Sequence, residues 1–178
     1  IEPGQTFRLN SLKVVDEYRE AKTAGIETRP VLIGPVTYLL LSKRVADDSP
    51  SGAASTLDAL PALLAVYGEI LRQLAAAGAR WVQIDEPALV LDLDESARAA
   101  YVSAYAQLSA AADVQIMLAT YFGALGDNLA LALGLPAAGY HIDLVRAPEQ
   151  LAPVLAQLPE GKVLSVGVVD GRNVWRAD

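Results

Sequence analysis

Residues 81–93 read WVQIDEPALVLDL and give the clearest indication of the fold. It opens on an apolar run, Trp81 to Ile84, and then turns polar at Asp85 and Glu86, directly before Pro87. A short, nearly continuous apolar run is typical of a strand in a parallel sheet that helices cover. In such folds the side chains that bind and react sit where the strands end. The stretch therefore predicts a buried parallel strand that ends in a polar site.

Four other apolar runs resemble this one, and longer amphipathic patterns separate them. In all, strands are predicted at residues 30–33, 81–84, 114–119, 140–144 and 163–168. Helices are predicted from their i, i+3, i+4 apolar spacing. Thr56 and Asp94 are candidate N-caps for two of them, and Gly78 is a candidate stop. The predicted helices cover about residues 12–22, 56–77, 95–111, 127–133 and 148–158.

The alternation of helix and strand predicts an α/β fold with a parallel sheet and right-handed crossovers. A doubly wound sheet and a (β/α)8 barrel both fit this order. No glycine-rich phosphate fingerprint follows any strand, which weakens the nucleotide-binding version. A complete barrel needs eight strands and ~250 residues. We therefore expect residues 1–178 to form a single domain, a partial TIM-type barrel of about five parallel strands with flanking helices.

Composition excludes several classes of function. The formal net charge of −7 repels phosphate backbones and anionic lipid, so we expect neither nucleic acid nor a membrane as a partner. There is no apolar run of ~18 residues and no signal peptide pattern. The chain has no cysteine, which removes disulfides, thiolate nucleophiles and the preferred zinc ligands. We expect a cytoplasmic location.

Polar residues follow three of the other predicted strands as well. His141 and Asp143 are two residues apart, so they should point to one side of their strand. Arg172 could clamp a carboxylate with two parallel hydrogen bonds. The plainer alternatives are loop capping for the carboxylates, a hydrogen-bonded core histidine, and turn chemistry around Gly171. Thr120 and Tyr121 end their strand and could either donate hydrogen bonds or lie at the edge of the core. The full set of active-face candidates is Asp85, Glu86, Tyr121, His141, Asp143, Asp170, Arg172 and Asn173.

The sequence offers no catalytic constellation of its own. No Ser-His-Asp set can be assembled by spacing, and Ser165 lacks the context of a nucleophile elbow. A metal site needs three or four ligands, and with one histidine it would rest on carboxylates. We therefore expect no catalytic residue and no metal in this chain. The polar stretch 42–55 is predicted to be a loop on the face where barrel sites lie.

Five stretches, in this order, carry a resemblance that covers nearly the whole chain. They are VLIGPVTYLLLSK (31–43), WVQIDEPALVLDL (81–93), LATYF (118–122), HIDLV (141–145) and GRNVWRAD (171–178). Together they closely resemble the N-terminal half of the cobalamin-independent methionine synthase family. The absence of cysteine and the GRNVWR motif favour the N-terminal half over the C-terminal half. Both ends of the chain read as cuts, so we expect a fragment of a longer polypeptide.

The resemblance implies a function that these residues alone do not. Members of the family transfer a methyl group from 5-methyltetrahydrofolate polyglutamate to homocysteine and consist of two (β/α)8 barrels. The C-terminal barrel holds a catalytic zinc on His, Cys and Glu ligands, and the metal activates the homocysteine thiolate. The N-terminal barrel lacks zinc, braces the catalytic barrel and helps to form the folate groove. Asp85 corresponds in position to the Asp that contacts homocysteine in the catalytic half.

Two alternatives from other functional classes stay open at this point. One is a stand-alone decarboxylase that resembles uroporphyrinogen decarboxylase, which would need an arginine cluster near the N-terminus, where only Arg8, Arg19 and Arg29 occur. The other is a non-catalytic module that binds a small anion through Lys43, Arg44 or Arg172. In the leading interpretation, the partners are the C-terminal catalytic barrel of the same polypeptide and folate polyglutamate.

Overall fold

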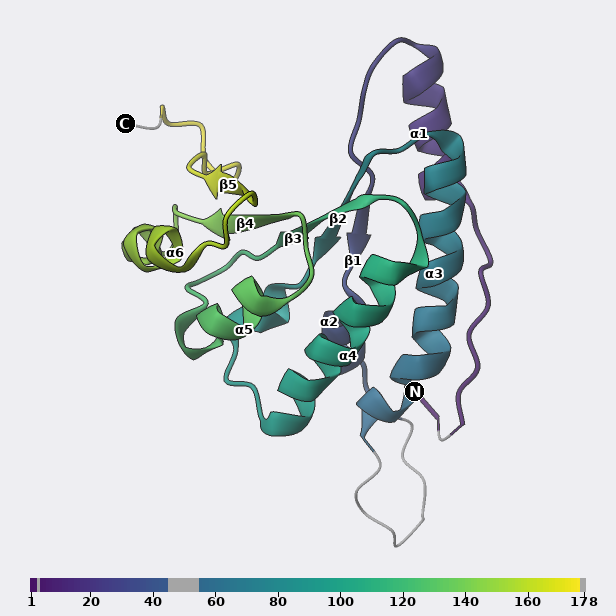
Figure 1. The fold of residues 1–178 in the computed structure, drawn as a ribbon, viewed down its shortest axis with the longest axis horizontal. Helices are drawn as coiled ribbons and strands as arrows, with labels where there is room; N and C mark the ends of the chain where they lie inside the picture. The colour runs from purple at the N-terminus through teal and green to yellow at the C-terminus, as the bar shows by residue number, and fades with distance from the viewer. Residues whose placement is uncertain (3, 45–54, 177–178) are drawn as a thin grey trace, which may run out of the picture.

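One parallel sheet organises the molecule. The computed structural model describes residues 1–2, 4–44 and 55–176, and its five strands pair in chain order, β1-β2-β3-β4-β5 (Figure 1). All four pairings are parallel. The predicted number and type of strands are therefore confirmed. The strands are β1 (Val31–Ile33), β2 (Trp81–Asp85), β3 (Gln115–Ala119), β4 (Gly139–Asp143) and β5 (Val163–Gly167).

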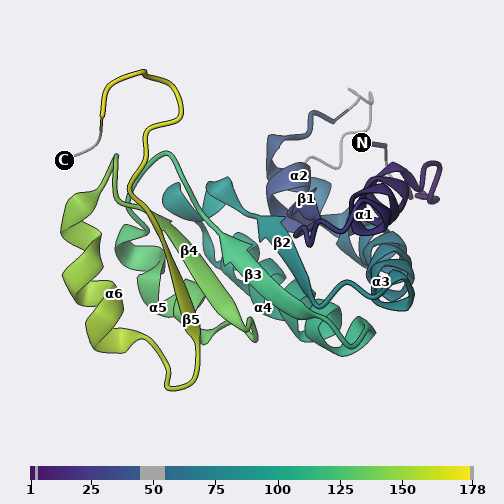
Figure 2. The same cartoon turned by 90° about the horizontal axis from the view of Figure 1, so that it is seen from above.

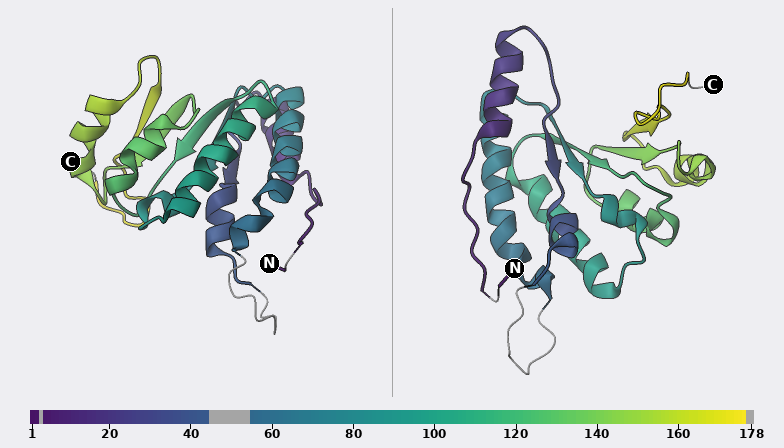
Figure 3. Two further views of the ribbon diagram at one scale, coloured as in Figure 1. Left: turned by 60° about the horizontal axis from the view of Figure 1, so that its bottom comes forward. Right: turned by 180° about the vertical axis from the view of Figure 1, so that it is seen from behind.

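The strand order distinguishes between the two sheet types that the sequence left open. A doubly wound sheet reverses its strand order at a switch point, whereas here each new strand joins the same edge. Right-handed crossovers that always advance in one direction leave all their helices on one face. Figure 2 shows the other face of strands β2 to β5 without helices, and the left view of Figure 3 shows the helix-covered face. The sheet is therefore an arc of a barrel.

In the part of the chain that the structure describes, six α-helices accompany the sheet, and most begin and end close to the predicted positions. Short 3-10 turns precede three of them, η1 (Thr56–Ala59), η3 (Gly126–Asn128) and η4 (Pro148–Gln150), and η2 (Pro87–Val90) follows β2. The sequence analysis missed one helix, α2, because its apolar residues continue the run that begins in β1. The helices are α1 (Lys13–Thr23), α2 (Pro35–Leu41), α3 (Leu60–Ala77), α4 (Glu95–Ala111), α5 (Leu129–Gly134) and α6 (Leu151–Gln157).

The structure differs from two local predictions, the helix cap at Thr56 and the position of the loop 42–55. The cap at the start of the third helical segment is Ser55 rather than Thr56, since the Ser55 hydroxyl accepts from Leu57 N at 3.2 Å. Ser55 N in turn donates to Asp58 Oδ2 at 2.9 Å, which completes a capping box. The predicted loop 42–55 does not follow β1 directly, because α2 intervenes, and its residues 45–54 lie outside the described residues.

The core lies between the sheet and the helices. Residues that alternate along the central strands point toward the helices and are buried there, among them Val82 and Ile84 of β2. Residues 56–77 are long and apolar enough, by length and composition alone, to cross a bilayer. In this fold α3 packs against α1, α2 and α4 instead. Its buried stripe is Leu60, Leu63, Leu64, Tyr67, Gly68, Leu71 and Leu74.

The opposite face of the sheet carries one continuous row of side chains. The pairing register aligns Ile33 with Asp85, Asp85 with Ala119, Ala119 with His141, and His141 with Ser165. Residues in register on parallel strands point to the same side. This row therefore places Asp85 and His141 on the helix-free face, near the carboxyl ends of their strands.

The N-cap of α4 offers a test of the local structure. Asp94 Oδ1 accepts from Ala97 N at 2.8 Å, as the sequence predicts. Asp94→Ala leaves that amide without its partner and should lower the free energy of unfolding by about 1 kcal/mol. Asp94→Asn keeps an acceptor oxygen and should stay near wild type. Urea unfolding of the three proteins measures this, and equal losses in both variants would contradict the capping role.

Candidate functional site

Asp85 ends β2 and is held by two neighbours on the open face. Its Oδ1 accepts from Gln83 Nε2 at 2.7 Å, and its Oδ2 accepts from the Tyr121 hydroxyl at 3.1 Å. Burial, followed by the charge of Asp85, raises the pKa of Tyr121 to about 12, so this hydroxyl remains a hydrogen-bond donor at neutral pH. The predicted candidates Asp85 and Tyr121 are thus brought together, although they belong to different strand ends.

His141 lies between Ala119 and Ser165 in the row, and its ring contacts the strand beyond it. Its Nδ1 lies 2.8 Å from the Ser165 hydroxyl of β5. The ring lies over Gly167, where an added Cβ would come within 3.0 Å of Nε2. Burial, followed by the charge of Arg29, lowers the pKa of His141, against the opposing charges of Asp85 and Asp143. The imidazole is therefore neutral at neutral pH and oriented by a hydroxyl.

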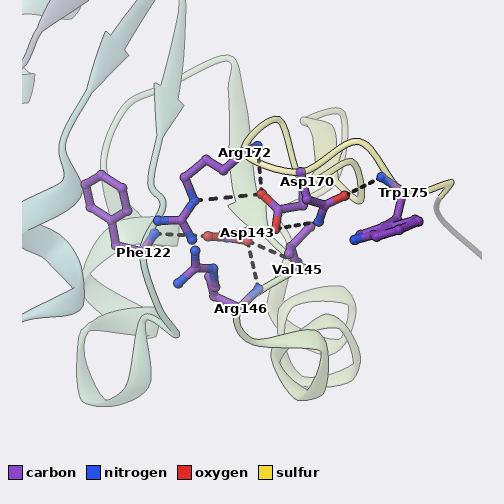
Figure 4. A network of polar contacts seen from close by, with 8 residues as sticks. Phe122, Asp143, Val145, Arg146, Asp170, Arg172 and Trp175 are labelled. Carbon is purple, nitrogen blue, oxygen red and sulfur yellow. Dashed lines mark hydrogen bonds and ion pairs between the residues drawn. The ribbon is translucent and has the colours of Figure 1, made fainter.

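Asp143 ties the end of β4 to the loop after β3. Its Oδ2 accepts from Phe122 N at 3.0 Å, and its Oδ1 accepts from Val145 N and Arg146 N, each at 3.0 Å (Figure 4). Phe122 has a φ of 82°, which is rare for a bulky residue and strained. The bond from its amide to Asp143 holds it there. Asp143 shares a face with His141 as predicted, and its carboxylate organises the two loops.

The last group of candidates forms a compact turn after β5. Asp170 Oδ1 accepts from Arg172 N at 3.0 Å, and its Oδ2 accepts from Asn173 Nδ2 at 2.9 Å. Asn173 Oδ1 in turn accepts from Trp175 N at 2.9 Å. This is the turn chemistry that the sequence analysis gave as the plainer alternative. The Arg172 guanidinium stays mostly exposed, with its Nε 3.8 Å from Asp170.

Glu86 does not belong to the open face, so that prediction is wrong. Neighbouring residues of a strand point to opposite sides, and Glu86 follows Asp85 into the helix layer, where it is fully buried. Its carboxylate accepts from Val36 N at 3.3 Å and Thr37 N at 2.8 Å at the start of α2. It also accepts from the Tyr101 hydroxyl of α4 at 3.3 Å.

Burial strongly affects this carboxyl group. Removal from water raises the pKa of Glu86 to about 7, and the hydrogen bonds from Thr37, Val36 and Tyr101 oppose that rise. The carboxyl group fits only because residue 34 is glycine: a Cβ on Gly34 would lie 1.9 Å from Glu86 Cδ. Gly34 and Glu86 therefore form one packing unit that joins β1, β2 and α2.

Thr120 has the core-edge role that the sequence suggested. Its amide and its hydroxyl both donate to His141 O, at 3.0 Å and 3.1 Å, and the residue is buried. Those bonds extend the contact between the ends of β3 and β4. The side chain is therefore not available on the open face.

A hollow of about 230 Å³ opens between the strand ends. It collects five of the predicted residues, together with two that the sequence analysis did not single out, Phe122 and Arg146. Phe122 ends the quoted stretch LATYF and Arg146 directly follows HIDLV, so their position after a strand was the signal that could have found them. The side chains that define the hollow include Tyr121, Phe122, His141, Asp143, Arg146, Asp170 and Arg172.

The available donors do not fit a zinc site. The whole chain lacks cysteine, and its one histidine already contacts Ser165 through Nδ1. Within residues 1–2, 4–44 and 55–176, no three His, Asp or Glu side chains are grouped so that they could hold a metal ion. The site instead supplies hydrogen-bonding and charged groups. Asp85, Arg146 and Arg172 carry the charges, and the neutral ring of His141 lies among them.

A parallel sheet that advances in one direction, with its polar row at the carboxyl ends, defines a barrel-type α/β domain. A methyltransferase from Methanosarcina mazei shares this fold with a TM-score of 0.57 at 16% identity, over 86% of this chain and 57% of that chain. The family model described as "Cobalamin-independent synthase, N-terminal domain" matches residues 1–178. The chain belongs to this family.

The curated relatives are much longer than this chain. The 5-methyltetrahydropteroyltriglutamate–homocysteine methyltransferase of Rhodopseudomonas palustris (strain TIE-1) is 59% identical over 176 residues, which is 98% of this chain and 22% of the relative. The enzyme of the same name from Caulobacter vibrioides is 56% identical over 179 residues, again 22% of its length. The chain thus spans about a fifth of the relatives it matches.

The raised pKa of Glu86 predicts an unusual pH dependence of stability. Between about pH 4.5 and 7 the folded protein keeps this proton while the unfolded chain loses it, so stability falls as pH rises. The loss attributable to Glu86 should reach about 3 kcal/mol. His141 acts in the opposite sense, because its lowered pKa favours the folded state at higher pH.

The measurement is chemical unfolding of the wild type and Glu86→Gln from pH 4.5 to 7.5. The difference between the two proteins cancels the contribution of His141 and isolates that of Glu86. We expect this difference to change steadily across the window and to level off above pH 7. A constant difference would show that Glu86 is ionised throughout, contrary to its burial.

The contact between Gly34 and Glu86 predicts that substitutions at these two residues affect stability non-additively. Gly34→Ala should cost about 1–3 kcal/mol of stability, because its methyl group meets the Glu86 side chain. In a Glu86→Ala background the same change should cost less than about 0.5 kcal/mol. Gly171→Ala, whose Cβ would meet nothing within 4 Å, is the matched control. Equal costs in both backgrounds would mean that the two residues do not pack together.

Proposed function

We propose that this chain acts as part of a methyltransferase that makes methionine from homocysteine and 5-methyltetrahydrofolate polyglutamate. The observation that supports this most directly is the family match over all 178 residues, to relatives that carry this activity in their name. Because the chain spans 22% of those relatives, the remaining part of such an enzyme would supply the rest of its machinery. We propose that this part includes a C-terminal catalytic barrel with zinc, and that the enzyme is cytoplasmic.

Within that enzyme, the role proposed for this chain is that of a metal-free scaffold. Its donor set does not suit zinc, and its open face carries hydrogen-bonding groups fixed by loop contacts rather than a nucleophile with a base. A rigid polar face at the carboxyl ends of barrel strands is suited to shape a groove for a substrate that another barrel activates. The proposed partners are therefore the catalytic barrel and the folate polyglutamate.

The two stand-alone alternatives find no support in the comparisons, since the matched family and relatives are methyltransferases. The decarboxylase also needs clustered arginines, whereas Arg19 pairs with Asp16 on α1 at 3.4 Å. Neither alternative is retained as the overall function of the chain.

A segment exchange tests the proposal. Residues 1–178 replace the matching segment of the Rhodopseudomonas palustris enzyme, and methionine formation is assayed with purified protein. We expect the chimera to retain activity, because the segments are 59% identical. The enzyme without the segment and the 178-residue chain alone are the controls, and both should be inactive.

Two results would contradict the proposal. One is a folded chimera with the zinc content of the parent enzyme that forms no methionine. The other is turnover by the 178-residue chain alone, because that would make it a catalyst rather than a scaffold.

A further inference from the structure

Two arginines, Arg146 and Arg172, line the hollow. The guanidinium N–H donors of Arg146 have no acceptor among the described residues, and no ion-pair partner is present there for this side chain. Arg172 has one ionic neighbour, Asp170, at the long distance of 3.8 Å. Both side chains line the same hollow, and Figure 4 shows them extending from their separate loops toward the same region. Together they present guanidinium donors that the described residues do not satisfy.

The carboxylates beside them are already occupied. Asp143 accepts three backbone N–H bonds, from Phe122, Val145 and Arg146. Asp170 accepts from Arg172 N and from the Asn173 side chain. A carboxylate that already accepts from two or three N–H groups has fewer of its roughly four acceptor positions left for a guanidinium than a free one has. The hollow is therefore short of acceptors and rich in charged donors.

The rim of the hollow is held in a strained shape. Phe122 keeps its φ of 82° because its amide binds Asp143 and its ring meets Tyr121 edge-to-face, with centroids 4.7 Å apart. Strain of this kind persists where surrounding contacts over-determine it, and it is concentrated at ligand clamps. The Phe122 side chain is 66% exposed, so the strained residue presents an uncovered aromatic surface beside the arginines.

We propose that this hollow binds the carboxylate of an organic acid, between the guanidinium groups of Arg146 and Arg172 and beside the Phe122 ring. Guanidinium and carboxylate match as planar groups with two parallel hydrogen bonds. A carboxylate group carries one charge even at the end of a dicarboxylic acid, whereas phosphate concentrates nearly two charges on one group. Asp143 and Asp170 therefore repel phosphate more strongly. Binding of a free acid does not depend on the proposed methyl transfer, whereas binding of a glutamyl chain rests on that proposed function.

The carboxylate could come from two sources with the same chemistry. One is a free small acid, and the other is a glutamyl chain, such as the triglutamate in the name of the relatives' substrate. Glutarate represents the first source and a triglutamate peptide represents the second. Inorganic phosphate serves as the comparison anion.

The experiment is a titration of the 178-residue chain, followed by NMR of the arginine Nε–H signals at constant ionic strength. We expect saturable shifts of the Arg146 and Arg172 signals with glutarate or triglutamate, and weaker effects of phosphate. Arg146→Gln should weaken binding about tenfold, the value for one charge-assisted hydrogen-bonded pair. Arg19→Gln on α1 removes the same charge from a distant exposed site and should leave binding unchanged.

The titration distinguishes the two carboxylate sources and tests whether the site exists. Tighter binding of triglutamate assigns the glutamyl source, and equal binding assigns a free acid. Absence of saturable shifts in a chain with a native circular dichroism spectrum overturns the proposal. So does phosphate binding as tight as glutarate binding, or an equal loss in Arg19→Gln, since either indicates general charge attraction. If Arg146→Gln fails to fold, Arg172→Gln and the wild-type shifts give the same answer.

Discussion

The carboxyl group of Glu86 is the point on which the arrangement of this domain depends. It lies out of water at the end of β2 and accepts hydrogen bonds from the first turn of α2 and from Tyr101 of α4. A buried carboxyl is stable only when its oxygens have partners, so this group fixes where both helices meet the sheet. The glycine at residue 34 gives it the necessary space.

The position of the Glu86 carboxyl group also determines which side chains lie on the open face. Because Glu86 is fixed on the helix side, Asp85 must point to the other side, where it meets Gln83 and Tyr121. The parallel register then continues the same row through His141 to Ser165. Loop contacts through Asp143 complete a polar mouth whose parts come from several strand ends. One buried interaction thus supports a site formed by residues that are distant in sequence.

Much of the fold followed from the sequence, because periodicity and caps are local signals. The five strands, the Asp94 cap and the Gly78 stop depend on neighbouring residues. Helix α2 was missed because apolar content alone does not separate a buried strand from a short buried helix. The site was harder to predict: Glu86 was assigned to the wrong face, although alternation along β2 gave the signal. Arg146 and Phe122 were not singled out, because their position after a strand is a weak signal and the hollow that they line is formed by several separate loops.

The central claim is that the Glu86 carboxyl lies in a dry, hydrogen-bonded site that joins strand β2 to helices α2 and α4. The most direct test is a pH titration of its side-chain ¹³C carboxyl resonance, recorded together with the Thr37 amide proton. The structure predicts one shared midpoint near pH 7, because burial raises the pKa to about 7 and Thr37 N donates to this group. A midpoint near 4.5, or a Thr37 amide that does not respond, would contradict it.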